Sequence, residues 1–520
     1  MNNRIQLPDR HHTSRASLRR LAIVVLALIL GLFATACAKT RLVRVLKTPD
    51  EIQTLDHRSS YLKIHTKDGH LYVLSKWRVD DTARQVSGDG DWFGLARETL
   101  GTGAFTVSLD DVALFETNVV QNSPAVAALA VITGISVAVT AYCIANPKSC
   151  FGSCPTFYVS DGKNAVLEAE GFSSSVAPSL EARDVDALYR VHPVGRDLTV
   201  TMKNEALETH VVHRVRLLAA ARPLGGRVLA TVDGEFREAA TDLRPVEACR
   251  ADEGDCRPKV RAFDGDERFS VTDGEDLARR EVIELQLLAA NGPRGLVIAS
   301  RQTLASTYIA YQSLAWLGRS ASDTLAALER GNRAVGGAFT RLRNAVGGIE
   351  VLAETTDGNW VRAGEVREMG PLATDIVAVP LPADATGRLR LRLARGHWRI
   401  DYLASARLGA RVEPHVIEPA SVTGPHKVPA APSSLITLPG DVYTYSFRLA
   451  NAAERDELFL ESQGYYLEWM RDEWLSEENK IRAAQLVLNP EQLLRDMAPE
   501  FKTQEPRMEA LFWGSRYAHR

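Results

Sequence analysis

Hydrophobic and polar residues alternate along the first part of the chain, most clearly in YLKIHTKDGHLYVLSKWRV, residues 61–79. A period of two predicts strands with one buried face, and the Asp-Gly pair at the centre predicts a tight hairpin turn. RQVSGDGDWFG and AFTVSLDDVALFET repeat this rhythm of strand and turn. We therefore expect residues 40–120 to form a small β-barrel-like domain, either an SH3-like barrel or a meander. Its Trp77 and Trp92 are interpreted as core and rim aromatics rather than as a ligand platform.

Two longer β-patterned regions follow. Alternating stretches such as DLTVTMKNEAL and HVVHRVRLLAA predict a β-rich domain over residues 148–330. This domain is expected to end in a helix at STYIAYQSLAWLGRSASDTLAALERG, where apolar residues recur every three or four positions. GRLRLRLARGHWRIDYLASARLG contains two alternating strands about a glycine turn, which predicts a β-sandwich-like domain over residues 335–450.

The pattern changes towards the C-terminus. From Glu454 the 3.6-residue period of a helix is visible, so residues 451–520 are predicted to be a helical C-terminal region. Its aromatic residues can form a partner-binding face or the core of a helical cap, and we favour the core; they are Tyr465, Tyr466, Trp469, Trp474, Phe512 and Trp513. The predicted fold is mainly β and multidomain, with a small SH3-like barrel, an apolar helix, β-sandwich-like domains and a helical C-terminal cap.

The N-terminus, residues 1–36, has the organisation of a lipoprotein signal peptide. Three arginines precede an uncharged apolar run, and the small residues Ala34, Thr35 and Ala36 lead directly to Cys37. We expect Cys37 to carry acyl chains such as palmitate and to anchor the protein in the bacterial cell envelope. A plain signal peptide or an N-terminal membrane anchor is the alternative. Because Ala38 stands where Asp often retains such proteins on the inner membrane, we expect the outer membrane, facing the periplasm.

A second apolar segment occupies residues 121–147, and no charged residue occurs between Thr117 and Pro147. Its length permits a membrane-inserted helix, whereas its Ala-, Val- and Gly-rich composition also suits a buried helix or hairpin. A full crossing of the inner membrane would place the cysteines that follow it in a reducing compartment. The sequence leaves both interpretations open.

The length and the net charge of the chain limit its domain organisation and the kinds of partner it can bind. A chain of 520 residues is too long for one ordinary core, so three or four units are expected. The formal net charge of -3 argues against a nucleic-acid partner, because phosphate binding needs a basic face.

Five cysteines follow Cys37, and disulfides are their default state in an oxidising compartment. Cys249 and Cys256 flank a polar loop and are expected to form a local bridge. Cys150 and Cys154 can close a glycine turn, and Cys143 can instead pair with either of them. No second pair of cysteines or histidines accompanies Cys150 and Cys154, which argues against zinc, and the spacing is not that of a CxxC redox motif.

The remaining candidates for chemistry are weak. His210 and His213 lie three apart in a predicted strand and would point to opposite faces, so they are not expected to share a metal. The acidic stretch 264–276 lacks the oxygen and glycine positions of a calcium loop and is interpreted as a solvated hairpin. We find no catalytic motif and predict no catalytic residue, metal or cofactor, although a triad dispersed along the chain leaves no local signature.

The segment SCPTFYVSDGKNAVLEAEGFSSSVAPSLEARDVDAL, followed by LTVTMKNEALETHVVHRVRLL, resembles a group of uncharacterised bacterial exported proteins and lipoproteins. Their shared pattern is Ser-Cys-Pro, an aromatic pair, an Asp-Gly turn, a hydrophobic strand and a Ser-Leu-Glu loop. The resemblance covers residues 150–218. It implies a β-hairpin at the head of a domain, with Cys154 near its base, and it implies no activity.

Two hypotheses for function follow. The first is a non-catalytic binding or scaffold lipoprotein of the cell envelope, held to the membrane at Cys37, with an envelope protein or a glycan as partner. The second is an envelope hydrolase whose catalytic residues are distant in sequence. We favour the first, because the lipoprotein signal and the several β-rich units support it.

Overall fold

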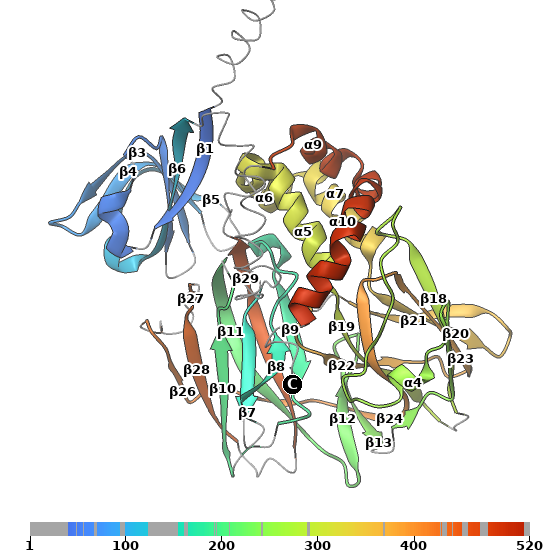
Figure 1. Ribbon diagram of the computed structural model, residues 1–520. Helices are drawn as coiled ribbons and strands as arrows, with labels where there is room; N and C mark the ends of the chain where they lie inside the picture. The colour runs from blue at the N-terminus through green and yellow to red at the C-terminus, as the bar shows by residue number, and fades with distance from the viewer. Residues whose placement is uncertain are drawn as a thin grey trace, which may run out of the picture.

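The computed structural model shows a mainly β protein whose strands pair antiparallel, together with one group of helices (Figure 1). The mainly β, multidomain prediction is confirmed. The structure describes residues 40–47, 49–55, 57–66, 70–93, 99–122, 154–160, 165–191, 193, 195–206, 208–240, 243–288, 292–367, 370–426, 428, 434–438, 440–449, 456–468 and 477–513. The predicted signal peptide with Cys37, and the apolar segment with Cys143 and Cys150, lie outside the described residues.

The first unit is a six-stranded sheet of order β1-β6-β2-β3-β4-β5. Its elements are β1 (Thr40–Lys47), η1 (Pro49–Thr54), β2 (Tyr61–Thr66), β3 (Leu71–Asp80), β4 (Gln85–Phe93), β5 (Thr99–Ser108), η2 (Leu109–Asp111) and β6 (Val112–Asn122). The predicted β2–β3 hairpin is present, and alternate residues such as Leu62, Ile64 and Leu74 form its core. Within the described strands the order begins at β1 and ends at β5, so the sheet is open rather than closed into a barrel.

The next unit, sandwich 1, is built from two distant chain segments. One sheet has the order β26-β28-β10-β7-β8 and the other β25-β11-β29-β9, with β27 also paired to β11. Its elements are β7 (Thr156–Ser160), β8 (Ala165–Glu170), η3 (Pro178–Leu180), β9 (Ala182–Ala187), β10 (Asp197–Lys203), β11 (Glu208–Ala221), β25 (His415–Ile417), β26 (Ser421–Thr423), β27 (Leu435–Thr437), β28 (Val442–Arg448) and β29 (Asp456–Glu468). Phe157 and Tyr443 from one sheet pack with Leu217 and Leu460 from the other.

Sandwich 2 is formed by the residues between these two segments. Its sheets have the orders β12-β13-β24-β19-β22, with β14 and β17 on β24, and β16-β15-β18-β23-β20-β21. Its elements are β12 (Gly226–Ala230), β13 (Phe236–Ala240), β14 (Arg244–Pro245), β15 (Ala248–Ala251), β16 (Gly254–Asp255), α4 (Arg257–Val260), β17 (Arg268–Phe269), β18 (Arg280–Gln286), β19 (Arg294–Gln302), β20 (Ile349–Thr355), β21 (Trp360–Val366), β22 (Asp375–Pro380), β23 (Ala385–Ala394) and β24 (Trp398–Val412). Leu285 and Leu391 from one sheet meet Ile298 and Leu403 from the other.

Sandwich 2 is therefore inserted into sandwich 1. The chain leaves sandwich 1 after β11 and returns to it at β25, and green and orange-red strands lie side by side in Figure 1. The predicted boundary at residues 330–335 does not follow this arrangement, because it separates β19 from its partners β22 and β24. Alternation along a sequence identifies strands but not which strand pairs with which.

The helices form one group, with α5 (Leu304–Leu317), η4 (Gly318–Ser320), α6 (Ala321–Glu329), α7 (Arg333–Val346), α9 (Lys480–Leu488) and α10 (Pro490–Trp513). α10 packs against α5, α7 and α9, and Ile309, Leu493 and Phe501 lie in the shared core. The predicted helix near residue 310 is confirmed. No helix in the described part of the chain is both long and apolar enough to cross a membrane.

The prediction of helix from Glu454 is wrong over Asp456–Glu468, which is the strand β29 between β11 and β9. β29 is buried on both faces, so its sequence lacks the clean alternation of a half-exposed strand. Tyr465 and Tyr466 are buried in sandwich 1, which confirms a core position for these two aromatics, in a strand rather than a helix. Trp469 and Trp474 lie outside the described residues.

Candidate functional site

The disulfide prediction is confirmed for Cys249 and Cys256, whose Cα atoms lie 5.1 Å apart. Both half-cystines are buried, and the bridge closes the short β15–β16 turn within sandwich 2. The Cys150–Cys154 alternative stays a prediction, because Cys150 lies outside the described residues.

Cys154 lies at the base of the β7–β8 hairpin, as predicted, in a group of buried polar side chains. Its backbone N–H donates to Oε1 of Glu208 at 2.5 Å, and its Sγ lies 3.0 Å from Oε1 of Glu170. Nε2 of His210 lies 2.6 Å from the same Glu208 oxygen, and neither side chain has exposed surface. This arrangement holds the hairpin to β11 from inside the sandwich and is closed to substrates.

The two histidines have separate partners, as their spacing predicts. His210 pairs with Glu208, whereas Nδ1 of His213 lies 2.7 Å from Oε1 of Glu181, next to a register shift in β11. Within the described residues, no three His, Cys, Asp or Glu side chains are arranged to hold a metal ion. In the acidic stretch 264–276, Asp273 accepts hydrogen bonds from two backbone N–H groups that follow it, which is the role of a turn residue.

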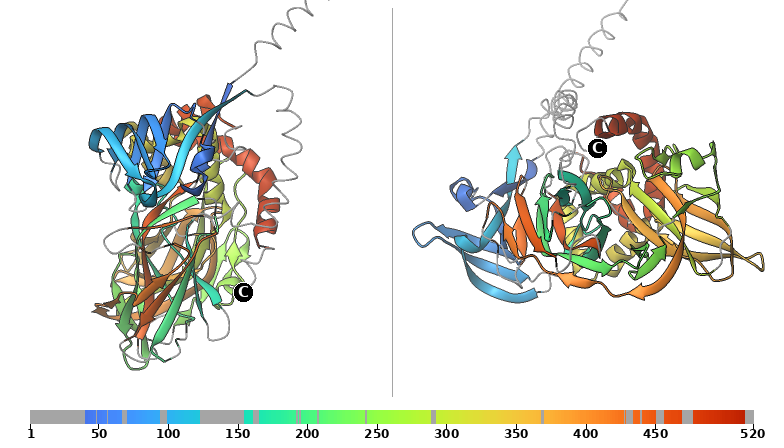
Figure 2. Two further views of the ribbon diagram at one scale, coloured as in Figure 1. Left: turned by 90° about the vertical axis from the view of Figure 1, so that its left-hand side faces the viewer. Right: turned by 90° about the horizontal axis from the view of Figure 1, so that it is seen from below.

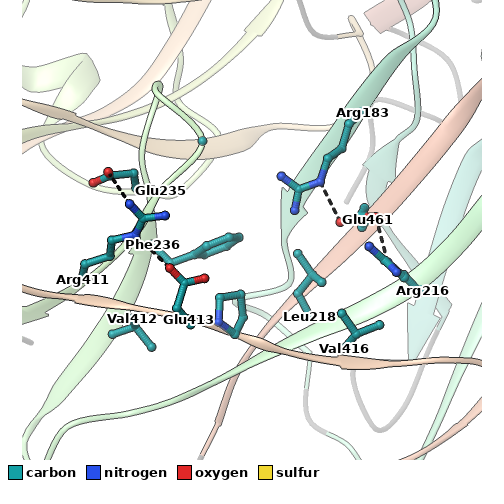
Figure 3. Close-up of a pocket in the computed structure, with 12 residues that line it drawn as sticks. Arg183, Arg216, Leu218, Glu235, Phe236, Arg411, Val412, Glu413, Val416 and Glu461 are labelled. Atoms are coloured by element: carbon teal, nitrogen blue, oxygen red, sulfur yellow. Dashed lines mark hydrogen bonds and ion pairs between the residues drawn. The ribbon is translucent and has the colours of Figure 1, made fainter.

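A pocket of about 270 Å³ lies where the two sandwiches meet, and its lining residues come from both (Figure 3). They are Arg183, Arg216, Leu218, Gly234, Glu235, Phe236, Arg411, Val412, Glu413, Pro414, Val416 and Glu461. β9, β11, β25 and β29 provide one side, while the β12–β13 turn and the end of β24 provide the other. Figure 2, seen from below, shows the two sandwiches side by side at this junction.

One wall of the pocket is organised by Glu461, a carboxylate with no exposed side-chain surface. Its Oε2 accepts from Nε of Arg183 at 2.7 Å, and its Oε1 accepts from Nε of Arg216 at 2.8 Å. Nη1 of Arg214 lies 3.5 Å from Oε1. Arg216 is directly opposite Glu461 in the β11–β29 ladder, so the sheet register itself brings the charges together.

The ionisation of Glu461 follows from these partners. Burial by itself raises the pKa of Glu461, but the hydrogen bonds and positive charges of Arg183 and Arg216 outweigh burial and bring the pKa below its ordinary value. Glu461 is therefore an anion at neutral pH. It holds the guanidinium groups of Arg183 and Arg216 at the pocket wall, with Arg214 beside them.

The opposite wall is charged but balanced. Nη1 of Arg411 donates to Glu235 at 3.0 Å, and its Nε donates to Glu413 at 2.9 Å. Arg237 also donates to Glu235, at 2.9 Å. Two arginines thus face two glutamates on this wall.

The floor between the walls is apolar. Leu218 and Phe236 lie between the ionic groups in Figure 3, and Val416 extends the floor at the mouth. Phe236 packs edge-to-face on Phe459 of β29, with ring centroids 4.8 Å apart. Leu218, Phe236 and Phe459 belong to a buried cluster that joins the two sandwiches, so the floor is rigidly supported.

A second group of carboxylates lies at the same junction, where β9 packs beside β22. Burial raises the pKa of Asp184 to about 7, with a further contribution from the nearby charge of Asp375. Burial also raises the pKa of Asp375 to about 6 and raises that of Asp186 well above its ordinary range. Glu170 links the sandwiches directly, because its Oε2 accepts from the backbone N–H groups of Leu372 at 2.7 Å and Ala373 at 3.4 Å.

The sequence analysis did not identify the pocket. The lining residues come from distant parts of the chain, from Arg183 to Glu461, and no local pattern connects them. Two signals in the sequence pointed to it. Arg214 and Arg216 alternate within the apolar HVVHRVRLL stretch, and Glu461 interrupts the apolar run LFLESQGYYL. A charged residue within a strand buried on both faces needs a partner, which is what the structure supplies.

No protein-family model matches this chain, and a comparison with curated proteins finds no match.

Proposed function

We propose that this chain is a bacterial cell-envelope lipoprotein that binds its ligand, without catalysis, in the pocket between the two sandwiches. The observation that carries the proposal is the lining of that pocket: fixed ionic groups on two walls around an apolar floor. Binding sites typically combine an apolar surface with a few well-placed polar groups that orient the ligand.

The lining also favours binding over reaction. The lining residues are Arg, Glu, Gly, Pro, Leu, Phe and Val, a set without serine, threonine, cysteine or histidine. Glu235, Glu413 and Glu461 are each ion-paired with an arginine. Carboxylates held in this way orient neighbouring side chains.

The alternative, an envelope hydrolase, receives less support from the described residues. Glu208 and His210 form the closest approach to an acid–base pair, at 2.6 Å, but neither side chain has exposed surface. A substrate needs a path to such a pair, and the β7–β8 hairpin and Phe172 cover it.

The membrane anchor in this proposal comes from the sequence. The basic n-region, the apolar run and the small residues before Cys37 support acylation at that cysteine. Intact mass spectrometry is expected to find acyl chains on Cys37 at the mature N-terminus of the wild-type protein and none on the Cys37→Ala variant. A wild-type protein without acyl mass on Cys37 would contradict a lipid anchor at this position.

Capture experiments test binding in the pocket. Val416 is an exposed residue at the pocket mouth, so Val416→Trp should obstruct the pocket without disturbing a core. Val442→Trp, also at an exposed valine of sandwich 1 but outside the pocket, is the matched control. Full-length protein in mild detergent is expected to retain an envelope protein or glycan. Val416→Trp should lose it and Val442→Trp should keep it.

Two results would count against the proposal. The first is recovery of the wild-type protein with no envelope component after crosslinking in intact cells. The second is equal recovery of the same component by wild-type protein and Val416→Trp, because the partner would then bind elsewhere.

A further inference from the structure

We infer that the ligand of this pocket is an organic carboxylate with an apolar body, held by the guanidinium group of Arg183. The inference rests on the proposed function and names the chemical class of its ligand.

The wall around Glu461 carries more positive than negative charge. Arg183, Arg214 and Arg216 share this single buried carboxylate, and the other carboxylate in contact with them is the exposed Glu418, 3.4 Å from Arg216. Three guanidinium groups therefore face two carboxylates on this side, whereas the Arg411 wall is balanced. An anion placed in the pocket is attracted to the Glu461 wall.

Arg183 supplies the hydrogen-bond donors. Its Nε is committed to Glu461, but neither of its Nη groups hydrogen-bonds another residue in the described part of the chain. Figure 3 shows both Nη groups pointing from β9 toward the middle of the pocket. Two parallel N–H donors on one guanidinium edge match the two oxygens of a carboxylate, and Glu461 holds this guanidinium in place before the ligand arrives.

The apolar floor and the volume of the pocket limit the size and polarity of the rest of the ligand. Leu218, Phe236 and Val416 offer an apolar surface beside the Arg183 head group, which favours a carboxylate attached to an aliphatic group over inorganic phosphate or sulfate. About 270 Å³ is slightly below the usual range for drug-sized ligands, so a small acid or the last residue of a peptide fits.

The test measures binding to full-length protein in detergent by isothermal titration. The probes are N-acetyl-leucine, 4-methylpentanoate and the primary amide of each. Both acids are expected to bind, and each amide should bind about tenfold more weakly or not at all, since the amide lacks the charge that Arg183 recognises. Tighter binding of N-acetyl-leucine would show that the amide group of a peptide end is recognised as well, and equal binding would show that the carboxylate and the aliphatic group are sufficient; either result supports the inference.

Variants of Arg183 test whether the preference for acid over amide arises at the Glu461 wall of the pocket. Arg183→Gln is expected to remove the preference for acid over amide. Arg183→Lys keeps the positive charge but lacks the two parallel N–H donors of a guanidinium group, so it should keep part of that preference. Arg448→Gln, at an exposed ion pair on β28, is the matched control and should bind as the wild type does. Equal binding of acid and amide by the wild-type protein, or no binding of any probe, would overturn the inference. In either case the result with Val416→Trp still decides the proposed function separately.

Discussion

Glu461 has no exposed side-chain surface, and three arginines form ion pairs with it. Its two oxygens accept hydrogen bonds from two different strands, β9 and β11, so the same carboxylate joins the sheet laterally and shapes the pocket wall. Glu457, four residues earlier in β29, is similarly buried and lies 3.2 Å from Arg222 and 3.5 Å from Arg227. Buried carboxylates of β29 thus pair with arginines of sandwich 1 and, through Arg227 of β12, with sandwich 2.

Replacing Glu461 by glutamine should therefore be costly. Glu461→Gln leaves guanidinium groups gathered around a neutral amide, and we expect a loss of about 3 kcal/mol in the free energy of unfolding, because breaking a buried ion pair leaves charge without compensation. Urea denaturation of the full-length protein measures this loss. Asp197→Asn, which breaks an exposed pair with Arg448, should change the free energy by less than about 1 kcal/mol. Equal effects of the two substitutions would show that Glu461 has no special role.

At the scale of elements, one carboxylate of sandwich 1 binds the loop of sandwich 2 that precedes β22. Glu170, the last residue of β8, accepts from the backbone N–H groups of Leu372 and Ala373 just before β22. Gly370 lies so close to this carboxylate that a Cβ added there would be 2.0 Å from its Oε2. A side chain at position 370 therefore has to displace either the loop or Glu170.

Gly370→Ala is accordingly expected to loosen the contact between β8 and the loop before β22. Amide hydrogen exchange followed by mass spectrometry should show faster exchange in peptides covering residues 370–380, and the free energy of unfolding should fall by about 1–3 kcal/mol. Gly336→Ala is the control, because a Cβ at Gly336 meets only Leu328, at 3.8 Å, and alanine favours the helix α7. Unchanged exchange at residues 370–380 in Gly370→Ala would show that the loop is held by other contacts.

The sequence predicted elements far better than it predicted their partners. The β2–β3 and β7–β8 hairpins, α5 and the Cys249–Cys256 bridge all depend on residues close together in the chain, and the structure contains them. β29 was mistaken for a helix because it is buried on both faces, so its sequence lacks the period of two that marks a half-exposed strand. Only the pairing with β11 and β9, which no local pattern records, distinguishes the two.

At the scale of the whole molecule, the insertion of sandwich 2 into sandwich 1 creates the junction that holds the pocket. Arg183 and Glu461 are far apart in sequence, and Arg411 lies across the pocket from them because the chain returns from β24 to β25 beside β11. The sequence shows the charged residues, but it does not show that the chain returns from sandwich 2 to sandwich 1 beside β11. The candidate site could therefore be identified only in the structure. The insertion of sandwich 2 into sandwich 1 also brings Asp184 and Asp186 of β9 close to Asp375 of β22.

This junction should make the stability of the protein depend on pH. Burial raises the pKa of Asp184 from 3.8 to about 7 and that of Asp375 to about 6, and it raises that of Asp186 as well. Because these folded-state pKa values lie above those of the unfolded chain, the folded state binds more protons. The stability these groups contribute is fully present below about pH 4 and is lost as the pH rises through 6 and 7. Glu168 and Glu170 add negative charge nearby, and Arg190 pairs with Glu168 at 2.9 Å.

Asp184→Asn removes one of these titrating groups and isolates its contribution. Asparagine also weakens the hydrogen bonds that Asp184 accepts from Phe172 and Val185, so the informative quantity is the change with pH rather than the absolute stability. Relative to the wild type, the variant should become more stable between pH 5 and pH 8, by about 2 kcal/mol, because Asp186 and Asp375 ionise in both proteins but only the wild type must also ionise Asp184 over that range. Urea denaturation at several pH values measures the difference, with exposed Asp197→Asn expected to follow the wild-type profile. A constant difference between Asp184→Asn and wild type across this range would mean that Asp184 is already ionised at pH 5 and that the junction does not respond to pH through this residue.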